Sequence, residues 1–318
     1  MDKIEEKSIL NYLSNIPFVY REELSVPKDM NFGAEIEFMT YKQNEVIKKF
    51  NKLMQEQKKN GNIKYYRLTD NKRIVKYNSG KKIIELKTPV LSNNKEDFVS
   101  LKNMCLTLSE NTMPSNQKGI HVHANMSLLE DNSEYLETLL KLFCVYEHIL
   151  FRFSYGEEEE SNINLASYSR EISNRLYKYL KKTDLNQDFN KTIEELRTLF
   201  NCKSYAINFH EKDLNCKSDT IEVRTFNSSF NPVIIQNDIN LVLSMVESIR
   251  NNNVDLDRLN YRFNEYDKGF YVKEKYSNLN LDDAIEFSDH IYSKDIDKDY
   301  FLRQYAIKDK PKQKKLVI

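Results

Sequence analysis

The sequence predicts an α+β fold in which a largely antiparallel sheet packs its helices on one face. Segments with the two-residue alternation of strands occur in clusters, and segments with helical spacing are inserted between those clusters. Strict alternation of single strands and helices, which would indicate a parallel sheet, is absent. The 318 residues contain no internal repeat and no long linker rich in Pro, Gly or Ser, so one large domain or two fused domains fit the length.

The strands are predicted from alternating apolar and polar positions and from the turn residues between them. They span roughly 32–39, 64–69, 73–78, 82–88, 119–126, 203–210 and 219–226.

The helices are predicted from apolar residues three or four positions apart. They span roughly 3–14, 44–58, 98–108, 132–154, 168–182, 187–200 and 232–251, and shorter helices follow. An acidic segment at 156–160 and a basic tail at 308–315 are expected to be solvated.

Composition limits the classes of function. Lys plus Arg and Asp plus Glu both number 48, and this balance indicates neither a nucleic-acid nor a membrane partner. The acidic start and the lack of a long apolar run predict neither a signal peptide nor a membrane span. The four cysteines are scattered, which fits a reducing cytoplasm. No P-loop and no GxGxxG motif occurs, so any nucleotide is held by other means.

The first candidate site residues are Glu35 and Glu37 in the strand at 32–39. Alternation turns both side chains to one face, while apolar neighbours occupy the other face. Two adjacent carboxylates repel each other unless a cation neutralises them. The alternative is an ordinary solvent-facing glutamate pair on an amphipathic strand.

Two further strands carry similar groups. Glu85 is the one acid within an apolar strand that Pro89 ends. His121 and His123 share one face of the strand at 119–126, a spacing known from metal ligands. The alternative is that these histidines are satisfied polar residues at the surface of a sheet.

A fourth strand places Glu222 and Arg224 on one face, with apolar residues behind them. A simple salt bridge between the two is one interpretation. The other is a metal-ligating acid beside a guanidinium that binds phosphate or developing negative charge. Together, the four strands would bring four carboxylates and an imidazole to one place, a set that suits two divalent, oxygen-preferring ions. The set comprises Glu35, Glu37, Glu85, His121 and Glu222, with Arg224 beside them.

Six short motifs occur in an order that resembles a known family. They are Gly33–Phe38, Glu85–Pro89, Gly119–Ala124, Ser169–Arg170, Tyr205–His210 and Thr220–Phe226. They resemble the amidoligase family, a branch of the glutamine synthetase and glutamate–cysteine ligase superfamily, over about residues 32–250. The sequence departs from the family pattern at Thr88, where a serine is usual.

The resemblance implies a sheet of the glutamine synthetase catalytic type that binds ATP and Mg²⁺ or Mn²⁺. Glu35, Glu37, Glu85, His121 and Glu222 match the family's metal-ligand positions. Arg170 and Arg224 match arginines that handle phosphate, and we expect these arginines and His123 to contact the nucleotide. Gly33 and Gly119 would allow close approach beside the metal ions.

The activity that the resemblance implies is carboxylate–amine ligation through an acyl phosphate, with Glu222, Arg170 and Arg224 as catalytic residues. The substrates would be a small-molecule or peptide carboxylate and an amine. The corresponding domain division is an N-terminal helical lead-in at 1–30, a catalytic domain at 31–250 and a C-terminal helical extension with the basic tail at 251–318. Neither the substrates nor the oligomeric state follows from the sequence.

Three other functions remain open at this stage. One is a metal-dependent hydrolase built on His121 and His123, although the oxygen-rich set disfavours zinc. Another is a phosphotransferase of the guanidino kinase type, against which the two histidines argue. The third is a catalytically inactive nucleotide-binding protein on the same scaffold, which would bind ATP or a partner without turnover.

Overall fold

The computed structural model describes nine stretches of the chain. They are residues 1–59, 66–70, 82–114, 119–155, 169–183, 188–201, 204–210, 219–266 and 279–307. The strand expected near 73–78, the acidic segment at 156–160 and the basic tail at 308–315 lie outside these described residues.

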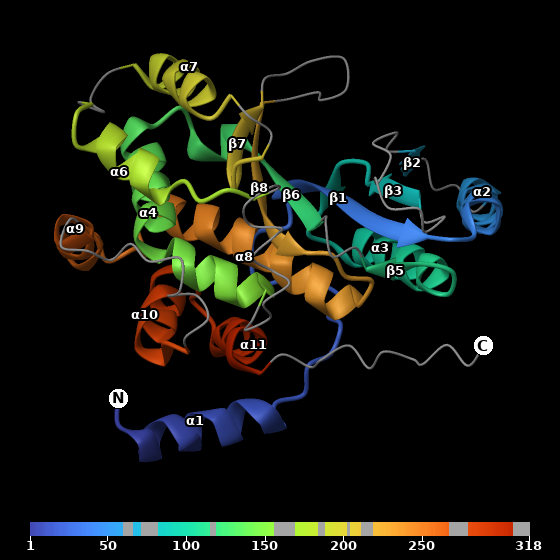
Figure 1. Cartoon of the computed structure of the whole chain (residues 1–318), viewed down its shortest axis with the longest axis horizontal. Helices are drawn as coiled ribbons and strands as arrows, with labels where there is room; N and C mark the ends of the chain where they lie inside the picture. Colours follow the sequence, from blue (N-terminus) through green and yellow to red (C-terminus); the bar gives the residue numbers. More distant parts are fainter. Residues whose placement is uncertain are drawn as a thin grey trace.

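An eight-stranded sheet forms the centre of the fold (Figure 1). Its strands are β1 (Asn31–Thr40), β2 (Arg67–Asp70), β3 (Lys82–Lys87), β4 (Leu91–Ser92), β5 (Met113–Pro114), β6 (Gly119–Asn125), β7 (Ile207–His210) and β8 (Thr220–Asn227). The main order is β2-β3-β1-β6-β8-β7, and the short strands β4 and β5 pair with β1. All these pairings are antiparallel, which confirms the predicted α+β class.

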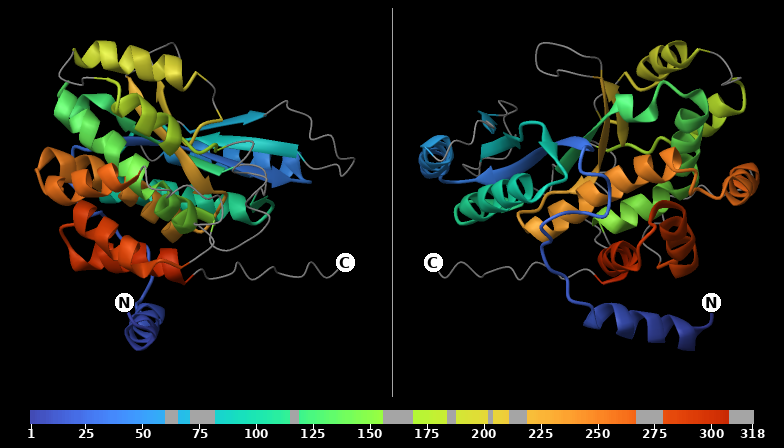
Figure 2. Two further views of the ribbon diagram at one scale, coloured as in Figure 1. Left: turned by 60° about the vertical axis from the view of Figure 1, so that its left-hand side comes forward. Right: turned by 180° about the vertical axis from the view of Figure 1, so that it is seen from behind.

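Helices surround the sheet and cover its apolar face. They are α1 (Lys3–Asn15), α2 (Gln43–Lys59), α3 (Lys95–Ser109), α4 (Ser133–Tyr155), α6 (Ser173–Leu180), α7 (Phe189–Leu199), α8 (Pro232–Arg250), α9 (Leu256–Glu265), α10 (Leu281–Ile291) and α11 (Asp295–Ala306), with a 3₁₀ turn at Met126–Leu129. α4 and α8 pack on each other and on the sheet, and α10 and α11 form a further layer beyond them (Figure 2). α1 packs on α11.

The alternation of β1 separates a core face from a polar face. Phe32, Ala34, Ile36 and Phe38 are almost completely buried. Phe32 stacks on Phe98 of α3 at a centroid distance of 5.7 Å. The intervening residues point away from this core, because successive side chains of a strand alternate between its faces. The core thus fixes which side of the sheet the glutamates of β1 occupy.

The predicted helix at 168–182 begins later than expected. Arg170 instead forms an isolated parallel bridge with Tyr205, and α6 starts at Ser173. The buried carboxylate of Glu147 on α4 accepts hydrogen bonds from the backbone N–H groups of Ile172 (2.7 Å) and Ser173 (3.1 Å). A side chain from another helix therefore caps α6, which sequence periodicity could not show.

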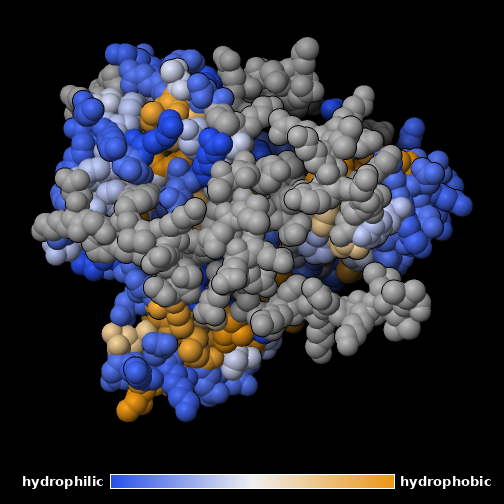
Figure 3. All heavy atoms as spheres, viewed as in Figure 1, coloured by the Kyte–Doolittle hydropathy of each residue, from blue (hydrophilic) through white to orange (hydrophobic). Residues whose placement is uncertain are grey.

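The surface of the described residues is mainly hydrophilic in the view of Figure 3, with apolar side chains gathered along the lower edge over α1 and α11. The exposed apolar residues of these helices include Ile4 and Ile296. None of the described helices has both the length and the apolar character that crossing a membrane would require.

Candidate functional site

Four neighbouring strands bring eight ionisable side chains together on the polar face of the sheet. We call these residues the carboxylate cluster: Glu35, Glu37, Glu85, Lys87, His121, His123, Glu222 and Arg224. The strand register explains the convergence. Glu35 lies opposite Lys87 on β3 and opposite His121 on β6.

The remaining pairings complete the cluster. Glu37 lies opposite Glu85, and His123 lies opposite Glu222. Because directly opposed residues of antiparallel strands project to the same face, each pair has its ionisable groups side by side. The structure therefore brings together all the predicted metal-ligand residues, together with His123 and Arg224.

His121 lies at the centre of the cluster. Its Nδ1 atom is 3.2 Å from Oε2 of Glu35 and 3.4 Å from Oε1 of Glu222. Its Nε2 atom is 3.6 Å from Oε2 of Glu37. One buried imidazole thus contacts carboxylates from three positions on two strands.

His123 forms a second, more exposed meeting point. Its Nε2 atom is 3.5 Å from Oε1 of Glu222 and 3.8 Å from Oε1 of Glu35. Its Nδ1 atom lies 3.3 Å from the hydroxyl oxygen of Thr220. The two histidines therefore share Glu35 and Glu222 as neighbours.

Arg224 is held in place from within its own strand. Its Nη1 atom donates a hydrogen bond of 2.7 Å to Oε1 of Glu222 and lies 3.3 Å from Nδ1 of His121. The amide of Asn208 on β7 donates to the other oxygen of Glu222 at 3.1 Å. The Nε atom of Arg224 is buried without a hydrogen-bond acceptor among the described residues. A rigidly placed guanidinium with a spare donor is suited to an anionic ligand.

Lys87 lies between Glu35 and Glu85, on the side of the cluster that β3 forms. Its Nζ atom is 2.5 Å from Oε1 of Glu35 and 3.5 Å from Oε2 of Glu85. The hydroxyl of Thr69 on β2 donates to Oε2 of Glu85 at 3.0 Å. No role for Lys87 is predicted from the sequence, although its position two residues after Glu85 places it on the same face.

The electrostatic environment shifts the pKa values of Glu35 and Glu85 in opposite directions. Burial by itself raises the pKa of Glu35, but His121, His123 and Lys87 outweigh it and hold that pKa well below its usual range. Burial and the negative charge of Glu35 raise the pKa of Glu85. Burial lowers the pKa of Lys87, but Glu35 and Glu85 together hold it above its usual value. Glu35 therefore keeps its charge to a lower pH than an ordinary glutamate, whereas Glu85 still lacks full compensation for its charge.

A β-bulge shapes β8 beside the site. Ile120 pairs with Phe226 and Val122 pairs with Val223, so β8 has one extra residue between these pairs. Strict alternation would put Phe226 on the same face as Glu222 and Arg224, yet Phe226 is fully buried and packs edge-on against Phe153 of α4. The bulge returns Phe226 to the core and leaves the charged pair at the site, a use of bulges that is common near active sites.

Gly119 permits close contact between strands. A Cβ atom at Gly119 would lie 2.1 Å from the backbone oxygen of Phe226. A Cβ atom at Gly33 would meet His123 at an ordinary 3.7 Å. Gly119 thus allows a close approach to the neighbouring strand, whereas it was expected to allow an approach to metal ions. Gly33 has room for a methyl group. Thr88 accepts a hydrogen bond from the N–H of Ala34 at 2.8 Å, so the hydroxyl at this unusual position helps to hold β3 on β1.

Backbone hydrogen bonds through Ala206 connect Arg170 to the strand that carries Arg224. Its carbonyl accepts a hydrogen bond from the N–H of Ala206, and the carbonyl of Ala206 accepts one from the N–H of Arg224. The side chain of Arg170 is exposed. The structure therefore places this residue one strand away from Arg224, while its contact with phosphate remains a prediction.

Two overlapping groups within the cluster have a geometry that could bind metal ions. One comprises Glu35, His123 and Glu222, and the other comprises Glu35, Glu85 and His121. In each group, one potential ligand atom per residue lies within 4.8 Å of the others. Each offers two carboxylates and one imidazole, a donor set that fits Mg²⁺ or Mn²⁺ better than a metal that prefers sulfur or nitrogen.

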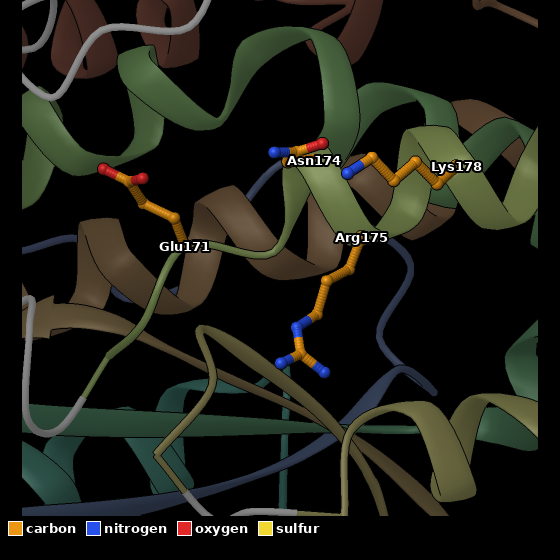
Figure 4. A pocket seen from close by; sticks show the side chains of 4 residues that line it. All are labelled: Glu171, Asn174, Arg175 and Lys178. Carbon is orange, nitrogen blue, oxygen red and sulfur yellow. The ribbon is translucent and has the colours of Figure 1, made fainter.

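A hollow of about 410 Å³ lies outside the cluster, at the start of α6. It is lined by Glu171, Asn174, Arg175 and Lys178, and Figure 4 shows Arg175 extending from α6 toward the strands. The guanidinium of Arg175 lies 5.0 Å from the ring centre of Tyr205, the residue that pairs with Arg170. The four side chains that line the hollow are exposed and of mixed charge, so the carboxylate cluster is the stronger candidate for a catalytic site.

Comparison with known protein families identifies the class to which the chain belongs. Residues 28–246 match the family described as "Putative amidoligase enzyme". The match covers more than half of the 318 residues and includes all eight members of the carboxylate cluster. The chain therefore belongs to this amidoligase family, as its motifs predict. A search of curated proteins finds no match.

Proposed function

We propose that this protein is an ATP-dependent carboxylate–amine ligase that requires Mg²⁺ or Mn²⁺. The observation that carries the proposal is the convergence of four carboxylates, two imidazoles and a fixed arginine on one face of the sheet in a member of the amidoligase family. Such a cluster repels a polyphosphate unless cations intervene.

The proposed reaction has two steps. The substrate carboxylate receives the γ-phosphoryl group of ATP, which releases ADP and gives an acyl phosphate. An amine then attacks the acyl carbon and loses a proton, inorganic phosphate leaves, and an amide forms. The first step is a phosphoryl transfer, for which catalysis depends mainly on positioning and on neutralising charge.

The residues of the cluster would divide this work. Glu35, Glu85 and His121 would hold one divalent ion, and Glu35, His123 and Glu222 would hold another. When bound, the ions would neutralise the oxygens of the transferred phosphoryl group.

Glu37 and Arg224 would act around these ions. Glu37 lies against His121 from the side opposite Glu35, so it would orient this imidazole or join it as a ligand. Arg224 would donate from its fixed position to phosphoryl oxygens, because Glu222 already restrains its guanidinium. Arg170 is a second candidate for this task.

Trapping the acyl phosphate with hydroxylamine tests the proposal without knowledge of the natural amine. The full chain is incubated with ATP, Mg²⁺, hydroxylamine and a panel of amino acids, dipeptides and small dicarboxylic acids. We expect ADP release that depends on one carboxylate class, with formation of the matching hydroxamate by mass spectrometry. The Glu222→Gln variant should form none.

Related assays on the same protein distinguish the alternatives. Zinc-stimulated hydrolysis of an ester or amide without ATP would favour the hydrolase built on His121 and His123. Reversible phosphate transfer to a guanidino compound without hydroxamate would favour the phosphotransferase. ATP binding without any turnover across the panel would favour an inactive nucleotide-binding protein.

A further inference from the structure

Lys87 stands out because it is the cluster's one flexible cation. It contacts Glu35 at 2.5 Å and Glu85 at 3.5 Å, and these are two of the three residues in one of the candidate metal-binding groups. The ammonium would therefore compete with a divalent ion for the carboxylates of that group.

The other candidate group has a different kind of cation beside it. Arg224 is 11% exposed, pairs with Glu222 and lies next to His121. Lys87 is 38% exposed, and its four-carbon side chain has several rotatable bonds. Lys87 can therefore turn toward solvent, at the cost of its contacts with Glu35 and Glu85, whereas Arg224 is held within the cluster.

We propose that Lys87 is a built-in counter-ion of the group formed by Glu35, Glu85 and His121, and that a divalent ion must displace it to bind there. This inference rests on the proposed metal-dependent function. When no divalent ion is bound, the ammonium reduces the repulsion between Glu35 and Glu85. The competition weakens this group as a metal site relative to the group formed by Glu35, His123 and Glu222.

The proposal has a consequence for occupancy. The protein should bind one divalent ion firmly and a second one more weakly, because Lys87 contacts two of the three residues of the group formed by Glu35, Glu85 and His121 but only Glu35 of the other group. Removing the ammonium should tighten the weaker class, since the uncompensated pair of carboxylates then attracts a divalent ion without competition. Removing a catalytic or purely structural lysine would not have this effect.

Titration with Mn²⁺ tests the inference directly, because free Mn²⁺ is measured by its electron paramagnetic resonance signal. The full chain is compared with Lys87→Met, with Lys87→Arg and with Lys49→Met. Lys49 is a matched control, because its side chain is about as exposed as that of Lys87 and it pairs with the exposed residue Glu110, which is not part of the cluster. Thermal unfolding of each variant verifies that it is folded.

We expect Lys87→Met to tighten the weaker class of Mn²⁺ sites by about tenfold or more, equivalent to about 1.4 kcal/mol. The firm class should stay within about twofold of the wild type, and Lys87→Arg and Lys49→Met should resemble the wild type. Unchanged or weaker binding in Lys87→Met would overturn the role of Lys87 while leaving the metal site intact. Failure of the wild-type chain to bind Mn²⁺ at all would overturn both this inference and the proposed function.

Discussion

Two groups of interacting ionisable side chains can be compared in this molecule. One is the carboxylate cluster on the sheet. The other, which we call the helical network, joins α4 to α9 and α10. It comprises Tyr146, His148, Arg258, Arg262, Asp283, Glu286 and His290.

The acids of the helical network are paired with cations of the same network. Asp283 pairs with Arg262 and lies 3.0 Å from Nε2 of His148. Glu286 accepts hydrogen bonds from Tyr146 at 2.6 Å and from Nε of Arg258 at 2.9 Å, and Arg262 also lies 2.9 Å from it. Its two carboxylates thus meet two guanidiniums, and charge is balanced within the network.

The carboxylate cluster is not balanced in this way. Its four carboxylates meet two permanent cations, so two negative charges stay uncompensated when both imidazoles are neutral. The pKa directions agree with this difference. Burial raises the pKa values of Asp283 and Glu286, but His148 and Arg262 outweigh it for Asp283, and Arg258, Tyr146 and Arg262 outweigh it for Glu286, so both are lowered. In the carboxylate cluster the pKa of Glu35 is also lowered, but that of Glu85 is raised. Charge balance thus distinguishes a network that stabilises packing from one that is suited to bind cations.

The largest expected effect is the loss of metal binding in Glu222→Gln. This change removes a charge from a candidate ligand that both histidines and Arg224 contact. We expect Mn²⁺ affinity at the firm class to fall by on the order of a thousandfold, about 4 kcal/mol, with the loss of all ADP release. Circular dichroism should show that the fold is kept. Full activity in this variant would refute the assignment of the site.

Arg224→Lys should have the next largest effect, and on rate more than on binding. A lysine ammonium cannot reproduce the planar fork of donors beside Glu222. We expect turnover to fall about a hundredfold, or about 2.7 kcal/mol, with little change in the affinity for Mg-ATP. Steady-state rates and a direct ATP titration separate the two quantities. A variant with a nearly normal rate would show that Arg224 is only a salt-bridge partner.

Asp283→Asn should show the opposite behaviour to Glu222→Gln. The change breaks charged hydrogen bonds that hold α10 to α9 and α4, so we expect the free energy of unfolding to fall by about 2 kcal/mol. Mn²⁺ binding should not change. Urea unfolding and the Mn²⁺ titration measure the two effects. A loss of metal affinity with normal stability would contradict the division into a structural network and a binding cluster.

The smallest expected effect is the difference in pH dependence between the two groups. A carboxyl whose pKa is lowered on folding, as in Asp283, adds stability that is lost as pH falls through the folded pKa. A carboxyl whose pKa is raised, as in Glu85, adds stability that is lost as pH rises through the folded pKa.

We therefore expect Asp283→Asn to reduce the loss of stability at acid pH, below about 4. With a chelator present, Glu85→Gln should reduce the loss of stability as pH rises above about 4.5. Denaturant unfolding at several pH values measures both. Identical pH profiles for the two variants would remove the distinction.

The sequence predicted the site's side chains better than their surroundings. The two-residue period of strands placed Glu35 with Glu37, and His121 with His123, on common faces, because this period is fixed by the backbone. It could not show the bulge that buries Phe226, since a bulge depends on the partner strand. The register likewise decided that Asn208 and Thr69 support the acids.

The helical network was not predictable from the sequence. Its members come from α4 and, more than a hundred residues later in the chain, from α9 and α10, and only the packing of α4 with these two helices brings them together. Helical periodicity indicated which faces of these helices are apolar, but it carries no information on which helix packs against which. The same limit explains why the cap that Glu147 provides to α6 was missed.

The central claim is that divalent cations allow this acidic cluster to bind ATP. Calorimetric titration of the full chain with ATP, in Mg²⁺ or Mn²⁺ and then in excess chelator, tests it most directly. The uncompensated carboxylates should prevent binding of the polyphosphate in chelator, and binding should return when either ion is restored. Tight ATP binding that the chelator leaves unchanged would contradict the claim.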